Sequence, residues 1–145
     1  LDVRNFNSSL KEINKNYQNL RKIYLLIGEL DALRSVASYR ESLDYYSFPK
    51  LNRNNKNKLE IKDAYHPLLE EPVANFLKLN NKGMIITGSN MAGKSTFLRT
   101  IGLNILMAQT IATCPAKELK GTMFNILTSI SRTDNILKGK SFYFS

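Results

Sequence analysis

Two glycines separated by four residues, between an apolar run and an amphipathic stretch, constrain the fold of this chain more than any other feature. Residues 88–95 read Gly-Ser-Asn-Met-Ala-Gly-Lys-Ser. The compact apolar run at residues 84–87 predicts a buried parallel strand before them. A tight glycine turn between a buried strand and a helix predicts an α/β fold. The helix is predicted over residues 94–110, because apolar side chains recur there at helical spacing: Phe97, Leu98, Ile101, Ile105, Leu106 and Ala108.

The turn matches the full pattern Gly-x4-Gly-Lys-[Ser/Thr] of a phosphate-binding P-loop. Its glycines permit backbone conformations that a Cβ would obstruct. Backbone N–H groups can then point at phosphate oxygens beside the positive end of the helix. Lys94 would bring an ammonium group to the β- and γ-phosphates, and Ser95 a hydroxyl to Mg²⁺. A glycine turn without a ligand would not require this Lys-Ser pair. We therefore expect Mg-ATP to bind through Gly88, Ser89, Asn90, Met91, Ala92, Gly93, Lys94, Ser95 and Thr96.

Residues 10–46 contain no proline, and their apolar side chains recur at three- and four-residue spacing. This pattern fits two arrangements. One is a single long helix, which would act as a lever toward something outside this chain. The other is a pair of packed core helices that are broken near Gly28. The sequence does not decide between them.

The remaining segments predict short elements. Residues 50–58 are polar and basic and are interpreted as a loop. Short apolar segments predict a strand near residues 59–61 and a strand at residues 122–130, and residues 76–79 form another short apolar segment. A helical turn is predicted at residues 133–137. A run of basic residues surrounds the loop: Lys50, Arg53, Lys56, Lys58 and Lys62. We interpret this run as solvated rather than as a nucleic-acid contact, because no aromatic side chain is interleaved for base stacking.

The composition restricts the class of protein. A net charge of +9 permits binding to nucleic acid or to phosphates without demonstrating either. No stretch approaches the roughly 18 apolar residues of a membrane span. Because Cys114 is the only cysteine and His66 the only histidine, we expect no internal disulfide, no metal site at the histidine, and a reducing, cytoplasmic setting. The chain begins with Leu1 and ends inside a strand-like run at residues 141–145, so we expect a piece of a longer protein.

Beyond the P-loop pattern, the sequence resembles the DNA mismatch-repair MutS family in several motifs that occur in the same order. The run at residues 86–99, with Asn90-Met91 inside the loop, resembles the family's TGPNMGGKST segment. Leu106-Met-Ala-Gln109 followed by Pro115-Ala116 is similar to the family's LMAQ and VPA segments. Further similar segments lie at residues 28–37, 66–70, 74–75 and 128–141.

The resemblance implies a P-loop NTPase with an ABC-type ATPase core, preceded by a helical lever. Residues 1–48 would form the lever or connector segment, and residues 49–145 the N-terminal part of the ATPase domain. In the family, ATP binding and hydrolysis drive a DNA clamp within a dimer that sandwiches two nucleotides. The resemblance therefore implies three partners: ATP or ADP, DNA that is held by parts outside this chain, and a second copy of the full-length protein.

The resemblance also assigns roles to single residues. It implies that Lys94 acts in catalysis and that Pro72 and Val73 pack against adenine. Ser141 matches the serine that reaches the partner's γ-phosphate across the dimer, in the same dimer-facing segment as Asp134-Asn135.

The sequence departs from the family pattern at several positions. Ser89 and Ala92 replace a proline and a glycine, and Pro72 stands where an aromatic residue is common. Phe142 and Ser131-Arg132 are further replacements in the dimer-facing segment. These departures suggest a divergent paralogue. Two alternatives therefore stay open: a paralogue that acts in recombination or another DNA transaction without mismatch sensing, and a nucleotide-gated interaction module.

Hydrolysis in the family needs a hydrophobic strand that ends in Asp-Glu, and the sequence up to residue 145 contains none. The resemblance implies that the parent protein is a DNA-dependent ATPase, which would have this strand outside this chain. We expect this chain alone to bind ATP without efficient hydrolysis.

Overall fold

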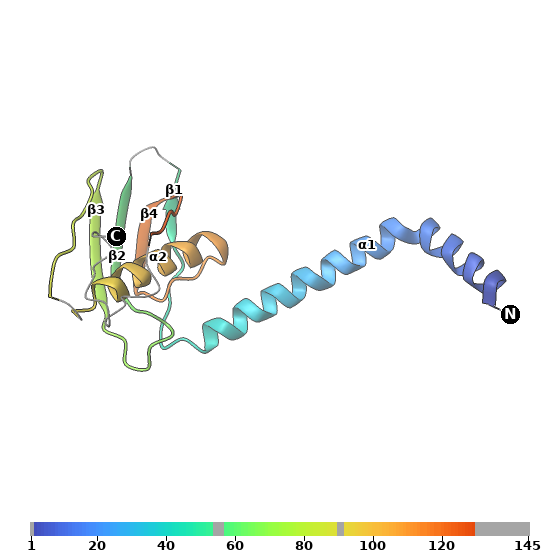
Figure 1. Cartoon of the computed structure of the whole chain (residues 1–145), viewed down its shortest axis with the longest axis horizontal. Helices are drawn as coiled ribbons and strands as arrows, with labels where there is room; N and C mark the ends of the chain where they lie inside the picture. Colours follow the sequence, from blue (N-terminus) through green and yellow to red (C-terminus); the bar gives the residue numbers. More distant parts are fainter. Residues whose placement is uncertain (1, 54–56, 90–91, 130–145) are drawn as a thin grey trace, which may run out of the picture. The chain divides into compact units, whose positions relative to one another are not determined.

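The computed structural model describes residues 2–53, 57–89 and 92–129, and these divide into two units, residues 1–42 and residues 43–145. The first unit is one helix, α1, which spans Asp2–Glu41 (Figure 1). Gly28 lies inside it without interrupting it, so of the two arrangements left open by the sequence, the pair of helices broken at this glycine is wrong. A glycine inside a helix costs only about 1 kcal/mol relative to alanine, which a long helix tolerates. The apolar side chains expected to pack together, Leu20, Ile23 and Leu30 among them, are exposed.

The second unit contains a four-stranded sheet with the strand order β1-β4-β2-β3 (Figure 1). Its strands are β1 (Lys50–Asn52), β2 (Lys58–Ala64), β3 (Asn75–Asn80) and β4 (Glu118–Thr122). β2 pairs antiparallel with both β3 and β4, whereas β1 pairs parallel with β4. The strand predicted at residues 59–61 is therefore confirmed and is longer than predicted, and the apolar segment at residues 76–79 lies within β3.

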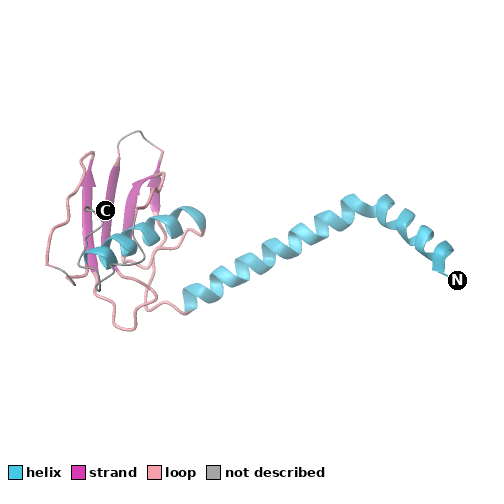
Figure 2. Ribbon diagram, in the orientation of Figure 1, coloured by secondary structure: helices cyan, strands magenta, loops and turns pink. Residues whose placement is uncertain are grey.

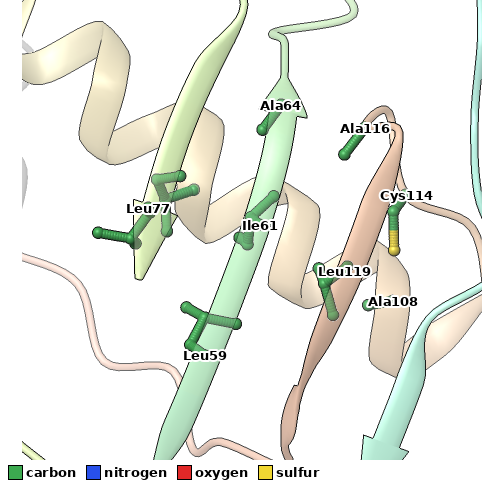
Figure 3. Packing of buried hydrophobic residues seen from close by; sticks show 9 residues of the cluster. Leu59, Ile61, Ala64, Leu77, Ala108, Cys114, Ala116 and Leu119 are labelled. Carbon is green, nitrogen blue, oxygen red and sulfur yellow. The ribbon is translucent and has the colours of Figure 1, made fainter. Parts of the chain in front are cut away.

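One helix, α2, lies across one face of this sheet (Figure 2). It spans Lys94–Thr110, as its apolar spacing predicts. Strand side chains alternate between the two faces of a sheet, and the face toward α2 is the apolar one. Figure 3 shows the packing of this core, which includes Leu59, Ile61, Ala64, Leu77, Ile101, Ala108, Cys114, Ala116 and Leu119.

Three predicted elements differ from the structure. Residues 84–87 form no strand, and Ile85 is 91% exposed. A buried parallel strand needs a hydrogen-bonding neighbour along each edge, and no described strand pairs with this segment. The strand predicted at residues 122–130 is wrong as well, because β4 ends at Thr122 and residues 123–129 are irregular. The predicted loop at residues 50–58 begins with β1.

Candidate functional site

The predicted P-loop joins β3 to α2, and its last glycine lies directly before the helix. Gly93 is the residue that caps α2, and its φ of 81° is left-handed. A Cβ added to Gly93 would meet nothing within 4 Å. It is therefore the backbone conformation, rather than a lack of space, that requires glycine here. Gly88 also has a positive φ, of 157°.

The side chain of Lys94 folds back over the loop. Its Nζ atom donates hydrogen bonds to the carbonyl oxygens of Gly88 at 2.7 Å and of Ser89 at 2.6 Å. The Ala92 N–H donates to the Ser89 carbonyl at 3.3 Å, which closes the turn between them. Two neutral carbonyl groups at the start of the loop thus hold the ammonium group. A phosphate oxygen would be a stronger acceptor, because it adds a charge-assisted bond.

The amino end of α2 has unused hydrogen-bonding capacity. Its first turn contains no acidic residue, and no described side chain caps it. The N–H of Phe97 donates to the Gly93 carbonyl at 2.8 Å, so the amides of residues 94–96 precede the first helical bond. The side chains of Ser95 and Thr96 are exposed beside these amides. This end of the helix can therefore accept an anion.

A divalent ion at Ser95 would have few protein ligands. Among residues 2–53, 57–89 and 92–129, no group of three or more His, Cys, Asp or Glu side chains could hold a metal. The Ser95 hydroxyl fits Mg²⁺, which keeps several waters and commonly shares phosphate oxygens as ligands. The residues present therefore suit a metal that arrives with a nucleotide.

The residues expected to contact adenine lie in the connection between β2 and β3. Pro72 is half-buried there and Val73 is 77% exposed. The side chain of Asn75 donates to the Val73 carbonyl at 2.7 Å and to the Ala64 carbonyl at 3.4 Å, which closes the connection. No hydrogen bond within the described part of the chain joins Pro72 or Val73 to the P-loop. Their role at adenine stays a prediction.

Several residues expected at the site lie outside the described residues. These are Asn90 and Met91 in the loop, and Ser141, Asp134, Asn135, Phe142 and the pair Ser131-Arg132 in the dimer-facing segment. The helical turn predicted at residues 133–137 and the strand-like run at residues 141–145 also lie outside them.

Two polar residues of α2, Asn104 and Gln109, hydrogen-bond to neighbouring segments of the chain. Neither of them was identified from the sequence as a structural residue. Asn104 is fully buried, and its side-chain nitrogen donates to the carbonyl oxygens of Tyr65 and Thr100. Gln109 bonds to the backbone of Phe124, beyond the end of β4. The signal for Asn104 was present in the sequence, because it lies three residues after Ile101 on the apolar stripe of the helix. A polar residue there needs internal partners.

Comparisons with known proteins place this sequence in a family. The family described as MutS domain V matches residues 84–145. The DNA mismatch repair protein MutS of Acetivibrio thermocellus is 35% identical over 97% of this chain, and MutS of Staphylococcus aureus strain JH9 is 33% identical over 97%. The DNA mismatch repair protein MSH3 of Candida glabrata is 31% identical over 95%.

The matched region is a small part of each relative. The chain spans 14% of the length of the MSH3 relative, and 16% and 17% of the two MutS relatives. No helix in the described ranges is long and apolar enough to cross a membrane. The matches nevertheless cover most of this chain and include the loop before α2, and the chain belongs to the MutS family of DNA mismatch-repair proteins.

Proposed function

We propose that residues 88–96 bind the triphosphate of Mg-ATP, and that the chain serves as the ATP-binding part of a MutS-family protein. The observation that carries this proposal is the position of the Lys94 ammonium, 2.7 Å and 2.6 Å from the two loop carbonyls. A bound phosphate would replace these neutral acceptors. The uncapped amino end of α2 adds backbone donors at the same place.

Each group has a distinct part in binding. The amides at the start of α2 would hold phosphate oxygens by directed hydrogen bonds, and Lys94 would add a mobile positive charge. Ser95 would supply one hard oxygen ligand to Mg²⁺. The metal would neutralise charge on the phosphates when bound. Asn90 and Met91 complete the loop, and Pro72 and Val73 would pack against the adenine.

The wider function follows from the family. The relatives are named as DNA mismatch repair proteins, which supports a role in which ATP binding changes the grip of a DNA clamp. In this proposal, DNA is held by other parts of the protein, two copies face each other, and Ser141 reaches the nucleotide of the partner. The alternative is a paralogue that acts in recombination or another DNA transaction without mismatch sensing. The complete protein would distinguish the two, because only a mismatch reader binds a mispaired duplex more tightly than its matched counterpart.

Titration of the 145-residue chain with a fluorescent ATP analogue and Mg²⁺ tests nucleotide binding. Lys94→Ala should weaken binding about tenfold or more, because a charge-assisted hydrogen bond is lost. Lys82→Ala is the matched control. It removes the same charge from an exposed position shortly before the loop, and it should bind like the parent. Equal binding by the parent and the Lys94 variant would overturn the proposal, as would the absence of any binding by the parent.

The metal is tested separately. Ser95→Ala should lose most of the gain in affinity that Mg²⁺ gives to the parent, while it retains binding in EDTA. An unchanged response to Mg²⁺ would exclude Ser95 as a ligand without affecting the assignment of Lys94.

A further inference from the structure

The face of the sheet turned away from α2 carries three lysines and one glutamate in register, one from each of the four strands. Lys50 of β1 lies opposite Lys120 of β4, which lies opposite Glu60 of β2. Glu60 in turn lies opposite Lys78 of β3. We call these four residues the lysine row. They alternate with core residues such as Ile61 and Leu119, so the row lies on the face that α2 leaves open.

The lysine row and the row beside it border one hollow. The second row includes Lys58 opposite Asn80, and Asn52 opposite Thr122. The hollow is lined by four lysines and one glutamate, so its charged side chains have a net charge of +3. Because these residues come from β1, β2, β3 and β4, the sequence could not show that they meet.

The acidic residues of this face are already shared among lysines. Glu60 pairs with Lys78 at 3.3 Å and with Lys62 at 3.7 Å. Glu118 pairs with Lys62 at 2.8 Å and also with Lys120.

Two lysines of the hollow remain without such a partner. No ion pair between described residues involves Lys50 or Lys58. Lys50 lies directly opposite Lys120, and like charges in this position disfavour the sheet. The face therefore has positive charge that its own carboxylates do not balance.

A buried hydroxyl lines the same hollow. Thr122 is only 7% exposed, and its Oγ1 atom has no hydrogen-bond partner among the described residues. Leaving a buried hydroxyl unpaired costs about 1–3 kcal/mol. An anionic oxygen in the hollow would neutralise the lysines directly, and it would become an acceptor for this hydroxyl where the lining shifts to expose it.

We propose that this hollow binds the phosphodiester backbone of a nucleic acid, in addition to the DNA that other parts of the protein would hold. This proposal replaces the interpretation of Lys50 and Lys58 as part of a merely solvated run. The reason is that the sheet brings both together with Lys78 and Lys120. The described lining contains neither an arginine nor an aromatic residue, so it lacks the groups that read or stack on bases. The same lining therefore lacks the aromatic side chains that are enriched at the centre of a protein interface. Lysines spread over a sheet instead suit sequence-independent contact with phosphates. The site is separate from the P-loop and does not depend on nucleotide binding.

Fluorescence anisotropy with labelled duplex and single-stranded oligonucleotides tests this site on the 145-residue chain. The parent should bind with a strong salt dependence. Lys50→Ala/Lys58→Ala should weaken binding on the order of tenfold at 0.1 M salt and should reduce the slope of log K against log salt by about 2. The control Lys22→Ala/Lys82→Ala removes the same charge from exposed positions outside the hollow and should bind like the parent. An equal loss in both variants would show that binding follows net charge alone and would overturn the proposal.

Two further titrations separate the hollow from the P-loop and a nucleic acid from an acidic protein. Lys94→Ala should bind the oligonucleotides like the parent, because its ammonium lies in the P-loop and not in the hollow. Displacement by an oligoglutamate peptide at the same charge concentration, together with weak oligonucleotide binding, would assign the hollow to an acidic partner instead and would contradict the proposal. Should the double variant unfold, Lys58→Gln provides the test, because it removes the charge and retains most of the side chain. An unchanged affinity in that variant would also count against the site.

Discussion

Both polar atoms of the Gln109 side chain bond to the backbone of Phe124. Its Nε2 atom donates to the Phe124 carbonyl at 3.1 Å, and its Oε1 atom accepts from the Phe124 N–H at 2.6 Å. Gln109 lies in the last turn of α2, whereas Phe124 follows the end of β4. A single side chain therefore fixes the point at which the chain leaves the sheet. It satisfies a backbone donor and a backbone acceptor that no described strand pairs.

Gln109→Ala removes both bonds. We expect the free energy of unfolding to fall by about 1–2 kcal/mol, and amide exchange at Phe124 to accelerate. Gln109→Glu is the matched variant. It keeps an acceptor for the Phe124 N–H but places a second oxygen against the carbonyl, so stability should fall while the amide stays protected. Unchanged exchange at Phe124 in the alanine variant would show that the glutamine does not hold this segment.

Asn104 is a fully buried polar residue of α2. Its Nδ2 atom donates to the Tyr65 carbonyl at 3.3 Å and to the Thr100 carbonyl at 3.0 Å, and its Oδ1 atom has no partner among the described residues. Asn104→Ala removes both bonds and leaves a cavity, so the free energy of unfolding should fall by about 2 kcal/mol or more.

Asn104→Asp separates hydrogen bonding from volume. It matches asparagine in size but buries a carboxylate, so thermal denaturation should show a larger loss at pH 7 than the alanine variant shows. Part of this loss should be recovered in acid as the carboxylate is protonated. Wild-type stability of the aspartate variant at pH 7 would mean that the position is hydrated rather than closed.

The sequence predicts local elements of this chain better than its sheet. α2 follows from the spacing of residues such as Phe97 and Ile101, because a helix makes its bonds within one segment. β1 could not be predicted, because Lys50–Asn52 is polar and forms a strand only by pairing with β4, far along the chain. The apolar run around Ile85 is predicted to be a strand and is not one. An apolar composition indicates a buried strand only where neighbouring strands are present to pair with it. The lysine row likewise depends on pairing between distant strands.

The candidate site was predictable to a similar extent. The glycine spacing predicts a loop followed by a helix, and Gly93 has the left-handed φ that only glycine adopts readily. The carbonyl partners of Lys94 depend on how the loop curves, which residue spacing does not define. Gln109 was noted only as the last residue of the family-like motif at residues 106–109. Its partner Phe124 lies just after β4, and the sequence wrongly predicts a strand over residues 122–130 there.

Cys114 provides a chemical test of the packing beside β4. Burial raises the pKa of its thiol to about 12 from the ordinary 9.0, because an apolar environment disfavours the thiolate. Its backbone exchanges two hydrogen bonds of 3.0 Å with Ser47. At pH 8 the thiolate should be about a thousandfold rarer than for an ordinary thiol. An aromatic disulfide reagent should therefore react slowly with the native chain and rapidly in guanidinium chloride. Rapid reaction without denaturant would show that the segment around Ser47 opens readily.

The ion pairs of the open sheet face predict how stability responds to acid. Hydrogen bonds from Lys120 and then Lys62 lower the pKa of Glu118 to about 2, from 4.5. A carboxyl whose pKa is depressed by folding stabilises the native state above its unfolded pKa. This contribution is lost as the pH falls through the window between 4.5 and about 2. The melting temperature of the parent should therefore decline across this window. Glu118→Gln cannot titrate, so its decline should be shallower and its stability near pH 6 should be lower.

Glu70→Gln is the control for this experiment, because Glu70 is exposed in the connection between β2 and β3 and forms no ion pair with a described residue. Its melting temperature should follow that of the parent at every pH. Salt screens the attraction between Glu118 and its two lysines. High salt should therefore reduce the difference in melting temperature between the parent and Glu118→Gln. Parallel pH profiles for the parent and Glu118→Gln would mean that solvent already screens these pairs.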